Sequence, residues 1–313
     1  MTLGVLGGFL LLMLCCFPGV THQMSVPIAL FEPGKEKLRA SLKLLSQLPS
    51  GRALLVDAEK RWAQRPTRQA MHIEDLFKWG AVSRTDAVLT RHFNPATGQE
   101  QQERNVTVYL KEDQTLDELA LDIAHELTHA IARPAWDPYD PNLTAGRYIM
   151  NAIEGDGGEV DAIISECRVG LEMVQNMGVN VPRCLRYKTT NKDGTVTVQV
   201  NQVQKDFYRV GKWYRPLLKQ LGSEARKFPL INDDEPQLYS STGYAPYPVA
   251  LYREFEELTR IACDNSRRRL TNLAVSLDRS PASSFAARER VDTFIKQRCN
   301  RMPEPLDPLF SGF

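Results

Sequence analysis

Two histidines and a glutamate stand close together near the middle of the chain. His125, Glu126 and His129 follow one another in the order His-Glu-x-x-His. On a helix, positions i and i+4 share one face, so both imidazoles can reach a single ion at the usual Zn–N distance of about 2.0–2.1 Å. The glutamate between them can take a proton from a metal-activated water. We therefore expect one zinc ion per chain on His125 and His129, with Glu126 as general base.

The third ligand must come from elsewhere, because a catalytic zinc normally takes three protein ligands and leaves one position for water. No histidine follows His129, and Ala135 stands where a longer histidine motif would place one. An acidic ligand is therefore expected. Glu159 opens the next expected helix, off its apolar stripe, where the helix N-terminus favours a carboxylate. We rank Glu159 first, with Asp161 and Glu154 as the alternatives.

Other polar side chains are candidates for supporting roles. Tyr148 is a candidate oxyanion donor, and Arg147 and Tyr109 are alternatives that the sequence does not separate. Asp122 lies one turn before Glu126 and is a candidate partner for a histidine ring. A solvated helix acid is the plainer interpretation of Asp122.

The segments around the motif predict an active-site helix beside a small sheet. Thr115 and Glu118 form a Thr-x-x-Glu capping box at the start of a helix over residues 116–132. Upstream, two β-rich runs within residues 84–112 flank a turn-forming cluster, which predicts a hairpin. The motif helix and the hairpin together predict the α+β class.

The remaining segments predict further helices and one more hairpin. Helices are expected over 35–65 with a break at 49–51, over 159–173, over 249–273 and over 281–298, and a hairpin is expected over 189–200. We divide the chain into a helical N-terminal region at 24–83, a catalytic core at 84–200, a mainly helical C-terminal region at 201–302 and an irregular tail at 303–313.

The first 22 residues predict export. Residues 3–20 are almost wholly apolar, which is typical of a signal peptide, although no Lys or Arg precedes them. An uncleaved membrane anchor is the alternative. We therefore expect a secreted or periplasmic protein, which contacts a membrane only through this segment if it is retained.

Four cysteines lie beyond the leader: Cys167, Cys184, Cys263 and Cys299. An even number in an exported chain permits two disulfides. Nearest-neighbour pairing would join Cys167 to Cys184 and Cys263 to Cys299. Buried free thiols are the alternative.

The overall charge argues against a nucleic-acid partner. The 313 residues carry a formal net charge of +1, with no long basic run. Because nucleic-acid affinity rests mainly on neutralising phosphates, we expect no nucleic-acid partner.

The motif and the start of the next expected helix resemble a known family. His-Glu-x-x-His followed by Glu159-Val160-Asp161-Ala162 resembles the gluzincin group of zincin metallopeptidases, over residues 84–175. The resemblance implies a zincin-like fold and zinc-dependent peptide hydrolysis, with His125, His129 and Glu159 as ligands and Glu126 as base.

Two departures from the family pattern bear on specificity. Ile163 stands where the full Glu-x-x-x-Asp form would place its aspartate, and the Gly-x-Met-Glu-Asn signature of the aminopeptidases is absent. An endopeptidase is therefore favoured.

Residues 49–55, with 125–130, are also similar to uncharacterised bacterial metallopeptidase domains. The rival hypothesis is an exported, non-catalytic binding or structural protein on a zincin-like scaffold.

Overall fold

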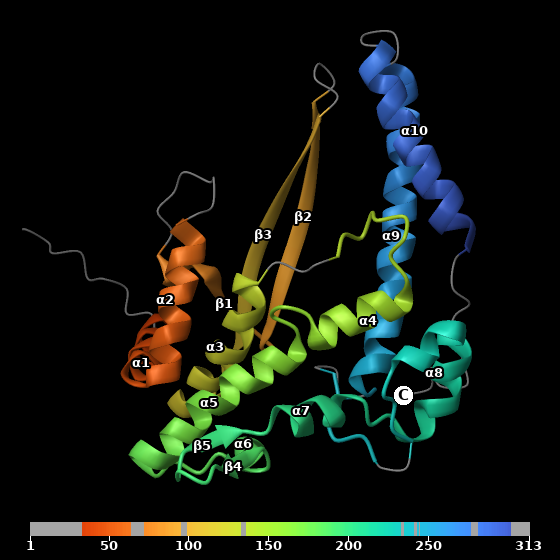
Figure 1. The fold of residues 1–313 in the computed structure, drawn as a ribbon. Helices are drawn as coiled ribbons and strands as arrows, with labels where there is room; N and C mark the ends of the chain where they lie inside the picture. Colours follow the sequence, from red (N-terminus) through yellow and green to blue (C-terminus); the bar gives the residue numbers. More distant parts are fainter. Residues whose placement is uncertain are drawn as a thin grey trace, which may run out of the picture. The chain divides into compact units, whose positions relative to one another are not determined.

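A computed structural model describes residues 33–63, 72–94, 99–132, 136–232, 235–240, 243, 245–276 and 281–301. From Gly34 onward these residues belong to one compact unit, which is treated alone below. The unit is α+β, mainly helical with a small mixed sheet, as the sequence predicts (Figure 1). The expected leader at 1–22 and the tail at 303–313 lie outside the described residues.

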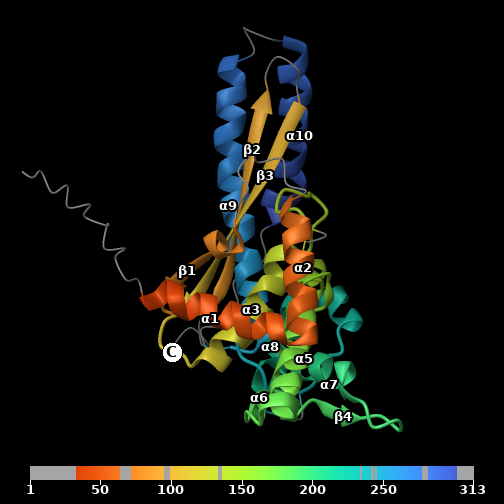
Figure 2. The same cartoon turned by 90° about the vertical axis from the view of Figure 1, so that its left-hand side faces the viewer.

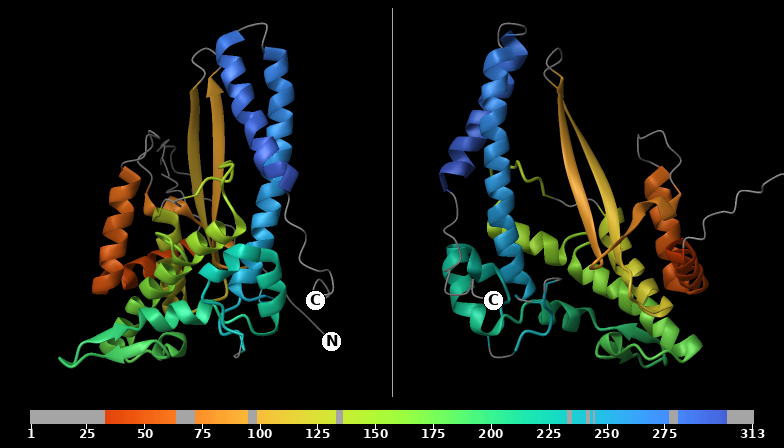
Figure 3. Two further views of the ribbon diagram at one scale, coloured as in Figure 1. Left: turned by 45° about the vertical axis from the view of Figure 1, so that its right-hand side comes forward. Right: turned by 180° about the vertical axis from the view of Figure 1, so that it is seen from behind.

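A three-stranded sheet lies beside the motif helix. Its strands are β1 (Phe77–Gly80), β2 (Arg84–Asn94) and β3 (Gln99–Lys111), in the order β1-β3-β2. β3 pairs antiparallel with β2, giving the expected hairpin, and parallel with the short β1, which the sequence did not reveal. Figure 3 shows β2 and β3 as a long twisted ribbon. β2 is thus an edge strand of the sheet.

The motif helix, α3 (Leu116–Ile131), has the predicted capping box. Thr115 accepts a hydrogen bond from the Glu118 backbone, and the Glu118 side chain accepts one from the Thr115 backbone. α3 packs against β2, β3, α2 and α5, so most of its side chains are buried. Leu116, the first residue of α3, is 45% exposed.

Two N-terminal helices are joined at a single residue. α1 (Pro33–Gln47) and α2 (Pro49–Ala63) flank Leu48. The observed break therefore lies just before the predicted one at 49–51. Pro49 begins α2 instead of ending α1, because the first turn of a helix needs no backbone donor from that residue. α2 then contacts both α3 and α5 (Figure 2).

The chain after α3 supplies the remaining helices. They are α4 (Ala145–Glu154), α5 (Glu159–Met177), α6 (Pro182–Leu185), α7 (Val200–Phe207), α8 (Tyr214–Leu221), α9 (Tyr247–Ser276) and α10 (Pro281–Arg298). Between α6 and α7, β4 (Lys188–Thr190) and β5 (Val196–Val198) form the second expected hairpin. Gly178, with φ +68°, ends α5 in the left-handed conformation that glycine favours.

One main core contains buried residues from helices α1 through α8, the three-stranded sheet and the start of α9. The later part of α9 packs along α10.

Disulfides join Cys167 to Cys184 and Cys263 to Cys299, which are the nearest-neighbour pairs. The second disulfide ties α9 to the chain just after α10. None of the described helices has the length and apolar run needed to cross a membrane.

Candidate metal centre

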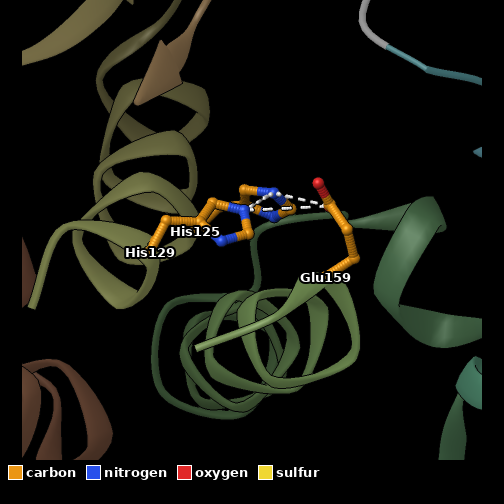
Figure 4. A group of neighbouring side chains, drawn as sticks. All are labelled: His125, His129 and Glu159. Atoms are coloured by element: carbon orange, nitrogen blue, oxygen red, sulfur yellow. Dashed lines mark hydrogen bonds and ion pairs between the residues drawn. The ribbon is translucent and has the colours of Figure 1, made fainter. Parts of the chain in front are cut away.

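Three potential metal ligands converge where α3 meets the start of α5. His125 and His129 project from successive turns of α3, and Glu159 is the first residue of α5 (Figure 4). The Nε2 atoms of the two histidines are 3.3 Å apart. Glu159 Oε2 lies 3.6 Å from His125 Nε2 and 3.8 Å from His129 Nε2. The residue ranked first as third ligand therefore lies beside both rings.

The hydrogen bonds of the two rings determine which nitrogens face the centre. His125 Nδ1 donates to Glu166 Oε2 at 3.0 Å, and His129 Nδ1 donates to the Gly157 carbonyl at 2.8 Å. A carboxylate and a carbonyl can only accept, so both Nδ1 atoms carry hydrogen. The Nε2 atoms of the two rings therefore face each other, and either a shared proton or a metal ion between them can satisfy both.

The spacing of the three donors is compatible with a zinc ion. Ligands about 2.0–2.2 Å from a tetrahedral zinc lie about 3.3–3.6 Å from one another. The three observed separations of 3.3, 3.6 and 3.8 Å approach that range. Glu159 Oε2 is also buried and has no hydrogen-bond partner among the described residues. Because a buried carboxylate oxygen normally has a partner, this atom is a natural metal ligand.

Opposing charges shift the pKa values of His125 and Glu159. Burial would lower the pKa of His125, but hydrogen bonds and charges from Glu159 and Glu166 hold it well above its ordinary value. Burial would likewise raise the pKa of Glu159, but His129, His125 and a hydrogen bond with Tyr247 bring it below its ordinary value. The centre therefore favours a positive charge, which a proton supplies when no metal ion is bound.

Glu126 lies beside the ligands and is buried. Its exposed fraction is 7%, and Thr85 Oγ1 on the edge strand β2 lies 2.8 Å from both its Oε2 and its backbone oxygen. Burial raises the pKa of Glu126, with the two histidines and the Thr85 hydrogen bond acting in the opposite direction. A buried carboxylate with a raised pKa can accept a proton more readily than a solvated one.

Sequence reasoning missed Glu166, the carboxylate that holds His125. It lies on α5 two turns after Glu159 and is 4% exposed. A signal was present, because Glu166 lies beside Cys167 on the buried side of α5, where an acid needs a partner.

Sequence reasoning also missed Tyr247, the first residue of α9. Its hydroxyl and Glu159 lie close enough for each to shift the pKa of the other, and its ring packs edge-on against Phe207. Burial, together with the charge of Glu159, raises the pKa of Tyr247. No local pattern links residues so far apart in the chain, so only the fold reveals this contact.

The two alternative third ligands have other partners. Asp161 accepts a hydrogen bond from the Gly157 backbone at 3.1 Å, within the turn that begins α5. Glu154, at the end of α4, accepts from Tyr208 and Gln204. The described group of possible metal ligands at this centre contains Glu159 and neither of these acids.

The proposed supporting residues, Tyr148 and Asp122, interact with other side chains. Burial and the charge of Glu254 on α9 raise the pKa of Tyr148, and the ring of Tyr148 packs against Trp136. Asp122 accepts from Ser83 and Gln114 and reaches His125 only through Arg183 and Glu166.

The two alternative oxyanion candidates also have partners elsewhere. Arg147 pairs with Asp140 at 3.3 Å, and the ring of Tyr109 lies under the guanidinium of Arg84. No interaction joins either of them to the three ligands among the described residues. The tyrosine whose pKa is raised by burial and by the charges of Glu159 and Glu126 is Tyr247.

Comparison of the chain with protein-family models, curated proteins and solved structures finds no match. The case for a metal centre therefore depends on the residues and their geometry.

Proposed function

We propose that this protein is a zinc-dependent peptidase of the zincin type, with a gluzincin-like ligand set. The observation that carries the proposal is the convergence of His125, His129 and Glu159 around a buried carboxylate oxygen that has no other partner among the described residues. Both histidines have their Nδ1 atoms occupied, which leaves the two Nε2 atoms free to bind one ion. Glu126 lies between the two histidines on the same helix.

Each residue then has a distinct task. When bound, zinc supplies Lewis-acid polarisation of water and of the scissile carbonyl. His125, His129 and Glu159 hold the ion, and Glu126 takes the proton from water at its carboxylate and passes it to the leaving amine. Thr85 holds the Glu126 carboxylate in place. Tyr247, whose hydroxyl interacts with Glu159, would help to keep that carboxylate directed at the centre.

The proposed substrate is a peptide or protein, cleaved internally. The absence of the aminopeptidase signature supports an endopeptidase. The apolar N-terminal segment and the two disulfides support action outside the cytoplasm, in a secreted or periplasmic setting.

The decisive experiment compares metal content and proteolysis in three purified forms of the full chain. The wild type should contain about one zinc per chain and cleave an unfolded protein substrate. Glu126→Gln should retain zinc and lose activity by at least about 10³-fold, because it removes the base and leaves the ligands. Asp117→Asn removes a partly exposed acid from the first turn of the same helix and should behave as the wild type.

Other outcomes point to the rival hypotheses. A wild type with zinc but no turnover on any peptide would indicate a binding or structural protein. A fourth protein ligand on the ion would indicate a purely structural metal. Equal activity in the wild type and Glu126→Gln would contradict the proposed mechanism outright.

A further inference from the structure

The two carboxylate oxygens of Glu166 have different partners: one contacts a histidine of the candidate metal centre, and the other contacts an arginine. Its Oε2 accepts from His125 Nδ1 at 3.0 Å, while its Oε1 pairs with Arg183 Nε at 2.6 Å. The side chain of Glu166 is only 5% exposed. Its position is therefore set by these two contacts, one of which is with a candidate ligand.

Arg183 connects two helices of the centre. It belongs to the short helix α6 and is 49% exposed, yet its Nη2 also pairs with Asp122 on α3 at 3.3 Å. Asp122 is itself held by Ser83 and Gln114. Arg183 thus bridges Glu166 on α5 and Asp122 on α3, the helix that carries both histidines.

A disulfide lies directly beside this bridge. Cys167 follows Glu166 in the chain, Cys184 follows Arg183, and the two cysteines are joined. Both are buried, with exposed fractions of 1% and 0%. A side chain at Gly170, one turn along α5, would bring its Cβ within 3.1 Å of Cys184 Sγ, so α6 lies closely against α5.

We propose that the Cys167–Cys184 disulfide and Arg183 act together as a positioning device for the metal centre. The disulfide holds α6 on α5, Arg183 then fixes the Glu166 carboxylate, and Glu166 orients the ring of His125. The proposal rests on the zinc site put forward above and adds a dependence of metal affinity on a cross-link that is not part of the ligand set.

The disulfide is needed because α6 cannot fix its own position. A helix of one turn has little intrinsic stability. A half-exposed arginine also loses side-chain entropy when it is held in one geometry, so its pairing with Glu166 depends on where its backbone lies. The chain just after α6 is anchored separately, because Arg186 and Tyr187 both bond to buried Asp206. Loss of the disulfide should therefore shift α6 without unfolding this region.

The test measures zinc affinity of the full chain by competition with a chromophoric chelator. Arg183→Gln, and separately Cys167→Ala together with Cys184→Ala, should each weaken zinc binding by about 10- to 100-fold, the usual effect of losing a partner that orients a ligand. Two matched controls should bind zinc as the wild type does. Arg168→Gln removes an exposed positive charge from α5, and Cys263→Ala with Cys299→Ala removes the other disulfide.

The sign of the effect separates positioning from simple electrostatics. Removing a positive charge near a cation site should tighten zinc binding, whereas loss of positioning should weaken it. In a Glu166→Gln background, Arg183→Gln should cause no further loss, because both act through one carboxylate. Cobalt-substituted Arg183→Gln should also show an altered visible spectrum, which a change in stability alone would not produce.

Each remaining outcome decides between the two proposals. A wild type that binds no zinc would overturn the proposed function and this inference with it. A wild type that binds zinc tightly, with affinity unchanged in Arg183→Gln, would overturn only this inference. Additive losses in the Glu166→Gln background would do the same. If the cysteine variant fails to fold, Arg183→Gln still decides the question, because it retains the disulfide.

Discussion

Each histidine of the candidate metal centre is held by a different kind of acceptor. His125 is held by the Glu166 side chain, and His129 by the main-chain carbonyl of Gly157. A carboxylate partner makes an imidazole more basic than a carbonyl does, so the two ligands are not equivalent. This asymmetry is a property of single residues, and it determines which substitutions should affect which ring.

The Thr85 hydroxyl provides a test of Glu126 at the same scale. Thr85→Val keeps the side-chain shape and removes a hydrogen bond to the ionised carboxylate, worth about 1.5–3 kcal/mol. Glu126 must be ionised to act as a base, so activity is lost as pH falls through its pKa. Because the Thr85 hydrogen bond lowers that pKa, its removal should move the acid limb of the pH–rate profile to higher pH. Zinc content should be unchanged.

A matched substitution completes this test. Thr85→Ser keeps the hydroxyl and should keep the wild-type pH profile. An unchanged acid limb in Thr85→Val would show that Thr85 does not act on Glu126.

Most residues of the candidate site could be predicted from the sequence, and two could not. Helical spacing predicted that His125, Glu126 and His129 share one site, and its place at a helix start predicted Glu159 as third ligand, which the structure puts beside both histidines. Glu166 and Tyr247 were missed, because their roles depend on how α5 and α9 pack, which spacing along the chain does not determine.

At the scale of elements, the turn before α5 determines how closely α5 approaches α3. Gly157 has φ +65°, and a Cβ placed on it would lie 2.0 Å from the Cβ of Ala132 and 3.0 Å from the Thr128 carbonyl. Only glycine fits both this backbone conformation and this contact. The same residue supplies the carbonyl that holds His129, so close packing and ligand orientation share one position.

Gly157→Ala should therefore weaken zinc binding by more than about 10-fold and lower stability, because it displaces the Gly157 carbonyl from His129. Zinc affinity can be measured by chelator competition and stability by urea unfolding.

Gly178→Ala is the control. Gly178 has a similar φ of +68°, but a Cβ added to it would meet nothing within 4 Å among the described residues. That change should cost about 1–2 kcal/mol of stability and leave zinc affinity unchanged. Equal zinc affinities in the two variants would contradict this account.

The capping box at the start of α3 makes a separate prediction. Thr115→Ala removes the acceptor for the Glu118 backbone and should lower the free energy of unfolding by about 1 kcal/mol. Thr115→Ser retains the cap and should lose much less. Urea unfolding monitored by circular dichroism would measure both, and equal losses would show that the hydroxyl is not the stabilising group.

Elements with strong local signals were predicted, and elements defined by packing were not. The capped helix and the β2–β3 hairpin were expected within a few residues of their bounds, since each has a turn or a cap in its sequence. β1 is too short to show a period, and it is defined by its pairing with β3. The zincin-like character of the fold remains a proposal.

At the scale of the whole molecule, the candidate centre adds a link between α3 and α5 to their packing and to the His125–Glu166 hydrogen bond. His125 and His129 come from α3 and Glu159 from α5, so a bound ion would cross-link the two helices. An ion that binds only the folded chain stabilises it in proportion to the logarithm of its concentration over its Kd. Zinc at 100 times its Kd should therefore contribute about 2.7 kcal/mol, seen as a rise in Tm.

Chelation should reverse this effect. Removing the metal should lower the Tm of the wild type, while His129→Ala, which lacks a ligand, should show a Tm that is indifferent to chelator. A wild-type Tm that does not respond to zinc or chelator would count against the metal centre.

The second disulfide should matter for stability and not for the metal. Cys263–Cys299 spans a sequence separation of 36, for which the chain-entropy description gives about 3–4 kcal/mol. Cys263→Ala with Cys299→Ala should therefore lose stability in urea unfolding. Proteolytic activity at low temperature should remain. The disulfide joins the later part of α9 to the chain after α10, whereas the three ligands lie on α3 and α5. Loss of activity in folded protein would show that this pairing also affects the centre.

The position of Tyr247 has a consequence for the order in which the site is made. A chain grows from its N-terminus at about 5–20 residues per second, so α3 and α5 leave the ribosome several seconds before α9 begins. The three potential ligands lie close together in the sequence and can meet by closing a short loop. The nascent chain can thus bring its metal ligands together while the tyrosine that completes their surroundings is still being translated.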